Sequence, residues 1–140
     1  MMVNDMVLKP HLSIMFDGQC EAAFRFYERC LGGTISFMLM WGQSPAAADV
    51  PPDWAEKVYH ATFKVDDFVM TGGDLPAEKY VKPKGFSIVL GIDSPAAAER
   101  IFNELAQNGR IAMPLQKTLW ASRYGALVDK FGIAWEVNCE

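Results

Sequence analysis

Two histidines and one glutamate are the residues of this 140-residue chain that are best suited to bind a divalent metal ion. His11 and His60 are the only histidines, and Glu136 lies near the C-terminal end. Imidazole nitrogens and a carboxylate oxygen form a divalent-metal site, and three such ligands leave coordination positions open. Open positions accept neighbouring oxygens of a substrate and stabilise an enolate or oxyanion. The residue types therefore predict a site for zinc, nickel, manganese or iron, in which Glu136 could also act as a catalytic base.

The three residues come together only if the two halves of the chain are related, and the sequence repeats itself once. The run LSIMF at residues 12–16 matches FSIVL at residues 86–90, with the shared serine 74 positions further along. A glycine two residues before an isoleucine then recurs in each half, and the offset grows to 76. At that offset Tyr59-His60 falls on Trp135-Glu136. We therefore predict that His60 and Glu136 occupy equivalent positions in two structural repeats.

Each repeat reads as strand, helix, strand, strand, strand. Helical spacing of apolar residues over 21–30 ends at Gly32-Gly33, and a second helix starts at Asp93-Ser94-Pro95, a polar cap followed by proline. Alternating or β-rich runs predict strands at residues 34–41, 58–65, 68–71, 124–128 and 133–137. The proline-containing stretches 42–53 and 72–84 are expected to be loops, the second of which links the halves. The fold class is α+β, with βαβββ modules at about residues 8–74 and 85–140 in one domain.

A βαβββ module covers one face of its sheet with its helix and leaves the other face free. Two such sheets placed edge to edge curl into a half-barrel cup lined by their free faces. Alternation along the strands places His60 with Thr62, and Glu136 with Asn138, on these faces. His11 shares its face with Ser13 in the same way. The cup is therefore the predicted site.

Four further residues are candidates for contacts with a substrate. Arg123 and Lys64 carry charges that suit an anionic or planar ligand, whereas Trp41 and Trp120 could form an aromatic wall. The alternatives are a solvated arginine at a strand edge, core packing of the tryptophans, and a salt bridge from Glu136 to Arg123 or Lys64.

The composition limits the possible partners and locations. The formal net charge is −4 and the pI is about 5.2, which is not typical of proteins that bind nucleic acid. No apolar run approaches the ~20 residues that cross a bilayer, and the first ten residues lack a signal-peptide core. Three cysteines without a CxxC motif indicate reduced thiols, and Cys20 and Cys30 are expected to be packing residues. We expect a cytoplasmic protein that does not bind a membrane.

Several motifs resemble the vicinal-oxygen-chelate superfamily, which includes glyoxalases, bleomycin-resistance proteins and dioxygenases. They are Gly18-x-Cys20-x-Ala22-Ala23-Phe24-x-Phe26-Tyr27, Met113-Pro114-Leu115-Gln116, Trp120, Tyr124-Gly125, and Asp129-x-Phe131-Gly132-x-x-Trp135-x-x-Asn138. Together they resemble the PhnB-like branch over nearly the whole chain. The resemblance implies paired βαβββ modules, a homodimer in which two chains often complete the cup, and a small-molecule ligand.

The resemblance also assigns roles to single residues. It places His11 at the first-strand ligand position, His60 at a ligand carried by some relatives, and Glu136 at the closing-strand glutamate. The ligand that opens the second half in relatives should fall near Phe86 or Ser87, where this chain has no good metal ligand. No glycine-rich strand-to-helix turn for a nucleotide cofactor is present, which argues against a methyltransferase.

Three functions remain open at the level of sequence. The first is a metal-dependent enzyme of the glyoxalase type, a lyase, isomerase or dioxygenase-like protein acting on a small oxygen-chelating metabolite. The second is a metal-free protein that sequesters a planar or anionic small molecule, as bleomycin-resistance proteins do. The third is a structural or regulatory dimer whose site has decayed. Metal analysis of the purified protein separates the first two.

Overall fold

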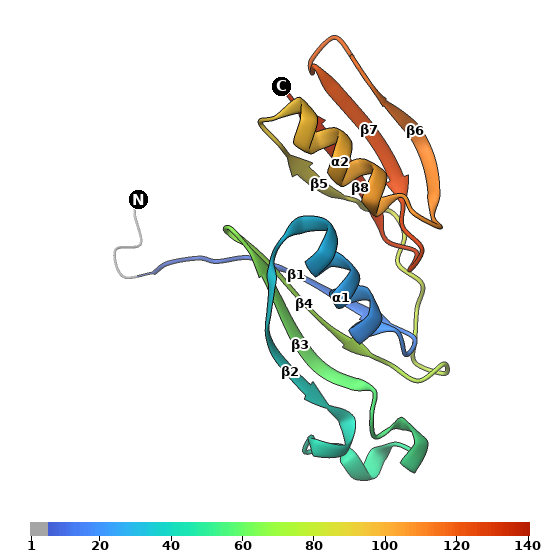
Figure 1. The fold of residues 1–140 in the computed structure, drawn as a ribbon. Coiled ribbons are helices and arrows are strands. Elements are labelled where there is room, and N and C mark those ends of the chain that lie inside the picture. The colour runs from blue at the N-terminus through green and yellow to red at the C-terminus, as the bar shows by residue number, and fades with distance from the viewer. Residues whose placement is uncertain (1–5) are drawn as a thin grey trace.

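The computed structural model describes residues 6–140 and consists of two βαβββ modules (Figure 1). The first contains β1 (Leu12–Phe16), α1 (Cys20–Leu31), β2 (Thr34–Met40), β3 (Val58–Val65) and β4 (Phe68–Asp74). The second contains β5 (Ile88–Gly91), α2 (Pro95–Leu105), β6 (Arg110–Gln116), β7 (Arg123–Val128) and β8 (Ala134–Cys139). The predicted α+β class and the order of elements in each half are confirmed. Residues 1–5, half of the stretch in which no signal-peptide core is expected, lie outside the described residues.

Each module forms its own four-stranded mixed sheet. The strand order is β1-β4-β3-β2 in the first sheet and β5-β8-β7-β6 in the second. In both sheets the first strand of the module pairs parallel to the last, and the other pairs are antiparallel. Within residues 6–140, β1 and β5 each form an unpaired edge. A continuous cup therefore requires these edges to meet another strand.

Both helices begin, and α1 ends, close to where the sequence predicts. Ser94 caps α2 by accepting a hydrogen bond from the backbone nitrogen of Ala97 at 3.2 Å, and Pro95 occupies the first turn. At the end of α1, Gly32 adopts a left-handed conformation with φ 77°, and its N–H donates to the Glu28 carbonyl at 3.0 Å. Glycine adopts this conformation without the steric penalty of a β-carbon. No helix within residues 6–140 is long and apolar enough to cross a membrane.

The fourth strand of the first module is longer than predicted. Gly72, Gly73 and Asp74 were expected to open the linker, but they are buried residues of β4. A β-carbon on Gly72 would lie 2.5 Å from the Ile14 carbonyl oxygen, so only glycine lets β1 approach this closely. Asp74 accepts backbone hydrogen bonds that tie the β1–α1 loop to the start of β3. The sequence Gly72-Gly73-Asp74 predicted a turn because glycine and aspartate also favour turns.

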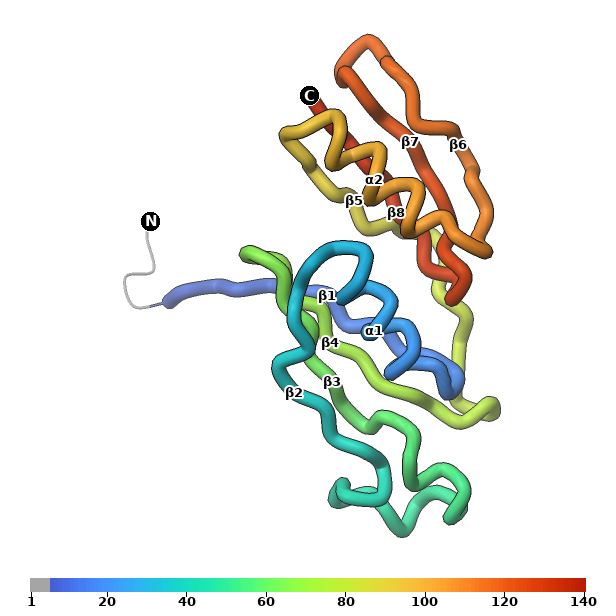
Figure 2. Tube along the Cα trace, in the orientation of Figure 1, coloured from blue at the N-terminus to red at the C-terminus, as the bar shows by residue number. Residues whose placement is uncertain are grey.

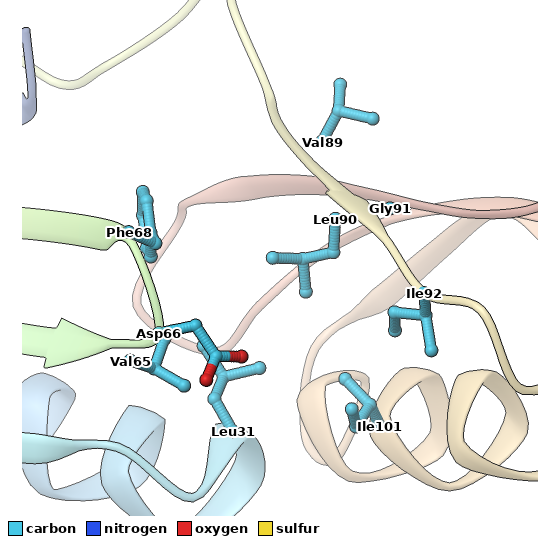
Figure 3. Close-up of a pocket in the computed structure, with 9 residues that line it drawn as sticks. All are labelled: Leu31, Val65, Asp66, Phe68, Val89, Leu90, Gly91, Ile92 and Ile101. Atoms are coloured by element: carbon cyan, nitrogen blue, oxygen red, sulfur yellow. The ribbon is translucent and has the colours of Figure 1, made fainter.

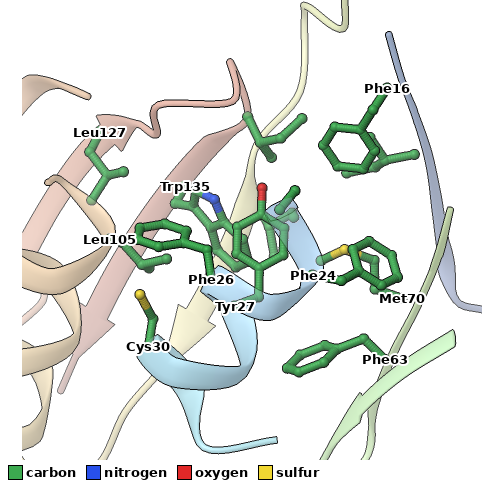
Figure 4. Packing of buried hydrophobic residues seen from close by; sticks show 14 of the residues in the cluster. Phe16, Phe24, Phe26, Tyr27, Cys30, Phe63, Met70, Leu105, Leu127 and Trp135 are labelled. Carbon is green, nitrogen blue, oxygen red and sulfur yellow. The ribbon is translucent and has the colours of Figure 1, made fainter. Parts of the chain in front are cut away.

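One hydrophobic core joins the two modules (Figure 4). The Tyr27 ring of α1 packs edge-on against the Trp135 ring of β8, with ring centroids 5.2 Å apart. The buried Asp129 carboxylate accepts hydrogen bonds from the Tyr27 hydroxyl at 2.6 Å and from the Trp135 Nε1 at 2.9 Å. The backbone nitrogens of Phe131 and Ile133 donate to its other oxygen. Asp129 thus holds the β7–β8 turn against the helix of the other module.

The cysteines contribute to this core and form no disulfide. Cys20, Cys30 and Cys139 are all buried as free thiols. Burial, together with the nearby Glu104 carboxylate, raises the pKa of the Cys30 thiol to about 11. A thiol with that pKa stays protonated at neutral pH, and the thiolate is the nucleophilic form.

Candidate functional site

One face of each sheet carries its helix, and the opposite face defines the candidate site (Figures 1 and 2). A β-carbon on Gly125 of β7 would meet the Phe102 ring of α2 at 2.8 Å, so Gly125 faces the helix. Side chains alternate along a strand, and the neighbouring Tyr124 and Ala126 therefore face away from α2. On β8 the fully buried Trp135 faces the core, which places Glu136 on the same open face as Tyr124. We call this surface the open face of the second sheet.

The Glu136 carboxylate is the polar centre of this open face. Its Oε2 accepts a hydrogen bond from the Ser87 hydroxyl, and its Oε1 accepts one from the Tyr124 hydroxyl. The hydrogen bond from Ser87, and to a smaller extent the one from Tyr124, lowers the pKa of Glu136 below its ordinary value. Desolvation acts in the opposite direction. The hydrogen bond to Glu136 raises the pKa of Tyr124 in turn. At neutral pH the site therefore contains an ionised carboxylate flanked by two neutral hydroxyls.

Exposed apolar side chains surround Glu136. Val89 of β5 lies directly beside it in the sheet, and Ala126 lies on its other side, followed by Met113 of β6. Val89 is 57% exposed and Met113 is 40% exposed. The Trp120 ring packs edge-on against Tyr124 with centroids 5.3 Å apart, yet it stays 62% exposed. The open face thus combines one negative charge with an apolar and aromatic border.

His60 lies on the open face of the first sheet. It is an exposed residue of β3, and its ring lies 5.9 Å from that of Phe37. The buried Phe63 contacts Phe24 of α1, so alternation turns His60 away from the helix. The predicted open-face orientation of His60 is thereby supported.

The structure differs from the predicted equivalence of His60 and Glu136. His60 is on the third strand of its module, whereas Glu136 is on the fourth. The strand pairs Ile14–Gly72 and Ile88–Trp135 correspond, because the two isoleucines match in the repeat. The residue equivalent to Glu136 is therefore the next one along β4, Gly73.

No side chain can occupy that equivalent position without a rearrangement. A β-carbon on Gly73 would lie 2.5 Å from the Tyr59 carbonyl oxygen and 3.3 Å from the Met15 side chain. The first sheet therefore lacks a carboxylate where the second sheet has Glu136. His60 instead lies beside Gly73, one residue beyond the Ala61–Gly72 pair.

His11 and His60 lie far apart on the first sheet. His11 is exposed and precedes β1 by one residue, which puts it level with Val69. His60 is level with Gly73, four residues further along β4. At about 3.3 Å per residue, this separates the two histidines by about 13 Å along the strands. A single metal ion cannot bind both side chains at that separation.

The other predicted contact residues lie in different surroundings. Arg123 turns toward α2, where its Nε donates to the Glu99 carboxylate at 3.0 Å. Trp41 is buried, and its Nε1 donates to the Asp74 carbonyl at 2.9 Å. Lys64 is exposed on the same face as His60, at the other end of β3. Only Trp120 is brought close to Glu136, through its contact with Tyr124.

Comparison with known proteins places this architecture in a family. Residues 9–137 match the model of the Glyoxalase/Bleomycin resistance protein/Dioxygenase superfamily. The chain belongs to this superfamily. Protein YjdN of Escherichia coli strain K12, to which the chain is similar, is 33% identical over 144 residues, and the alignment covers 95% of each chain. The predicted superfamily is thus confirmed.

Two solved structures show how closely the superfamily fold is shared. Protein PA1353 from Pseudomonas aeruginosa has 43% sequence identity and a TM-score of 0.85, with 96% of this chain and 98% of that chain covered. The PhnB protein from Bacillus cereus has 24% identity and a TM-score of 0.81, covering 95% of this chain and all of the other. This second likeness shows that the fold is shared.

The donor set of this superfamily member does not fit a three-ligand metal site within one chain. Among the described residues, no three histidine, cysteine, aspartate or glutamate side chains are grouped closely enough to hold a metal ion. Glu136 has hydroxyls as its neighbours, and hydroxyls of serine and tyrosine are poor ligands compared with imidazole or carboxylate. The site instead has the properties of a hydrogen-bonding and electrostatic recognition point.

Sequence reasoning missed the roles of Ser87 and Tyr124. Ser87 stands at the position that opens the second half, where the resemblance led us to expect a ligand, and it contacts Glu136. The shared serine of the repeat and the Tyr124-Gly125 motif were visible signals. Their convergence on one carboxylate was not, because 49 residues separate Ser87 from Glu136.

Proposed function

We propose that this protein binds a small organic molecule, without a metal ion, on the open face that carries Glu136. The observation that carries the proposal is an ionised carboxylate fixed by two hydroxyls and bordered by apolar side chains. Among residues 6–140 no ion pair involves Glu136, so its charge is available to a ligand. Ligand sites usually combine apolar and aromatic side chains with a few polar groups, and this face carries that combination.

The charges indicate a ligand that donates hydrogen bonds or carries a positive charge. The anionic ligand considered from the sequence would be repelled by Glu136. It would also lack Arg123 as a partner, because the Arg123 guanidinium forms an ion pair with Glu99 on the helix side of the sheet. The exposed Trp120 ring beside Tyr124 offers a surface for a planar group and for a cation–π contact. We therefore propose an aromatic or planar ligand with an amine or similar donor.

The ligand class is tested with three probes that share one ring but differ in charge. Phenethylamine is the cation, ethylbenzene the neutral analogue and 3-phenylpropionate the anion. We expect shifts of the Ser87, Tyr124 and Glu136 amide resonances in NMR titrations, with the amine binding most tightly. Tighter binding of the anion, or shifts confined to other surfaces, would contradict the proposed ligand class.

We further propose that the protein works as a homodimer in which two copies complete the cup. The unpaired β1 and β5 edges offer backbone groups to a second chain, and Phe37 on the first open face is 50% exposed. Exposed apolar residues gathered on one face mark interaction sites. Two copies joined by these edges would bring the open face of one chain's first sheet beside the second sheet of the other. Sedimentation analysis should then give twice the chain mass.

Metal-dependent chemistry of the glyoxalase type is the second candidate. His60 favours this candidate. It lies on the open face of the first sheet, level with Gly73, which is the residue equivalent to Glu136. In the proposed dimer both open faces belong to one cup. His60 and Glu136 would be the ligands, and the metal would supply Lewis-acid activation of a substrate oxygen.

Metal analysis of the purified dimer decides between these candidates. If the protein binds its ligand without metal, zinc, nickel, manganese and iron are each expected far below one per chain. His60→Ala should then leave amine binding unchanged. A metal content near one per chain that is lost in His60→Ala would instead establish the metal-dependent alternative.

The two hydroxyls should set the pH range of binding. Because Ser87 and Tyr124 stabilise the ionised form, they lower the pKa of Glu136, and their removal raises it. Binding of phenethylamine requires the ionised carboxylate and is lost as pH falls through this pKa. We expect a Ser87→Ala/Tyr124→Phe variant to lose binding at a higher pH than the wild type, in titrations from pH 7 to pH 3. If the variant and the wild type lost binding at the same pH, the hydroxyls would not control the pKa of Glu136.

A further inference from the structure

A hollow lies at the junction of the two modules, and one of its lining residues, Val89, also borders Glu136 (Figure 3). It has a volume of about 300 Å³ and lies between the β3–β4 turn, the end of α1, β5 and α2. Its apolar lining includes Leu31, Val65, Phe68, Leu90, Ile92 and Ile101. Asp66 contributes the one carboxylate, which Figure 3 shows directed toward Leu31 at the edge of the hollow. We call this hollow the junction groove.

The size and charge of the junction groove favour an anchoring side chain over a free metabolite. Small-molecule sites usually measure about 300–1,000 Å³, so this groove lies at the lower limit. No ion pair among the described residues involves Asp66. A fitting occupant therefore carries one or two aliphatic side chains next to a positive charge.

The chain itself contains a segment with this chemistry. Met6, Val7 and Leu8 precede β1 and are 57%, 77% and 76% exposed. They are followed by Lys9 and Pro10. Figures 1 and 2 show this segment running away from the body of the molecule. Pro10 has no N–H to donate, which opposes continuation of the parallel β1–β4 ladder along this segment. We call residues 6–10 the arm.

Dimer geometry brings the arm to the junction groove of a second copy. In a twofold-symmetric dimer, pairing of the β1 edge of one chain with the β5 edge of the other occurs twice, and we propose that these two strands run antiparallel. The start of β1 then lies beside the end of β5. The arm, which precedes β1, continues past Gly91 and Ile92 of the partner, and both residues line the junction groove.

We propose that the arm of each chain docks in the junction groove of a second copy. Its aliphatic side chains fill the groove, and Lys9 pairs with Asp66. This inference rests on the proposed dimer and adds the segment that locks it. Docking in the groove would remove from water one or two apolar side chains of the arm that are otherwise exposed.

Matched valine variants test the docking by sedimentation equilibrium. Val7 is 77% exposed in the arm, and Val81 is 81% exposed in the linker between the modules. We expect Val7→Asp to raise the dimer dissociation constant by at least about tenfold, since a carboxylate entering an apolar groove is desolvated without a partner. Val81→Asp should leave it unchanged. Equal effects of the two variants would overturn the proposal.

A charge exchange tests the ion pair. Lys9→Glu should weaken the dimer by about two- to fivefold, the range of an exposed ion pair, and Asp66→Lys in the same chain should restore it. Lys79→Glu in the linker is the matched control. A photo-crosslinker at position 7, in a mixture of ¹⁵N-labelled and unlabelled chains, should react with β5 or α2 of the other isotope. Crosslinks within one chain only would show that the arm docks on its own module.

The outcomes separate this inference from the proposal on which it rests. A wild-type protein that stays monomeric at all concentrations overturns both the dimer and the docked arm. A dimer that tolerates Val7→Asp and Lys9→Glu overturns the arm alone. Phenethylamine binding at Glu136, measured in each variant, shows independently whether the ligand site is intact.

Discussion

Replacing Glu136 by glutamine should reduce the affinity for phenethylamine by about 10- to 100-fold. A hydrogen bond to a charged group contributes about 1.5–3 kcal/mol, and each 1.4 kcal/mol corresponds to a factor of ten. Glutamine keeps the size of the side chain but removes the charge that Ser87 and Tyr124 hold in place. Isothermal titration calorimetry of the variant against the wild type measures the loss.

The matched control is Glu99→Gln, which removes the same charge on the helix side of the same sheet. Glu99 pairs with Arg123 and does not border the open face. Binding should be unchanged in this variant, and binding of neutral ethylbenzene should be nearly the same in all three proteins. If Glu99→Gln weakened amine binding as much as Glu136→Gln, the effect would come from net charge and the proposed site would be wrong.

Replacing Asp129 by alanine should lower the free energy of unfolding by roughly 3 to 5 kcal/mol. The carboxylate is 3% exposed and accepts hydrogen bonds from four donors. A buried donor left without a partner costs about 1–3 kcal/mol, and large losses of stability usually come from breaking a buried network of this kind. Urea unfolding followed by circular dichroism measures the change.

Two further variants apportion this loss. Tyr27→Phe removes a single donor and leaves the other three bonds intact, so it should cost about 1 to 1.5 kcal/mol. Asp129→Asn keeps one acceptor oxygen and should fall between Tyr27→Phe and Asp129→Ala. Because Tyr27 lies on α1 and Asp129 follows β7, the network spans both modules. A change below about 1 kcal/mol in Asp129→Ala would show that ring packing alone holds the modules together.

The local elements were predictable because short-range patterns specify them. Ser94 and Pro95 start a helix by satisfying or omitting backbone donors, and Gly32 ends one by its freedom to adopt positive φ. The repeat of residues 12–16 at 86–90 predicted two copies of one strand arrangement, and the superfamily match agrees. Alternation along β3 and β8 was sufficient to place His60 and Glu136 on open faces.

The candidate site depended on strand order and register, which hydrophobic patterns do not encode. An offset in the sequence linked His60 to Glu136, but hydrogen-bond ladders place them on non-equivalent strands. The charge of Arg123 alone does not indicate which side of the sheet its side chain faces. In the structure it faces α2, where it pairs with Glu99.

The sequence by itself determined the two βαβββ modules, their helix ends, their repeat and the superfamily, because each depends on contacts between residues close in the chain or on a motif order. Only the tertiary structure decided that Ser87 and Tyr124 flank Glu136, that Gly73 excludes a matching carboxylate, and that His11 lies far from His60. These depend on how strands distant in sequence pair, and a shift of one residue in register moves a side chain to the other face of a sheet.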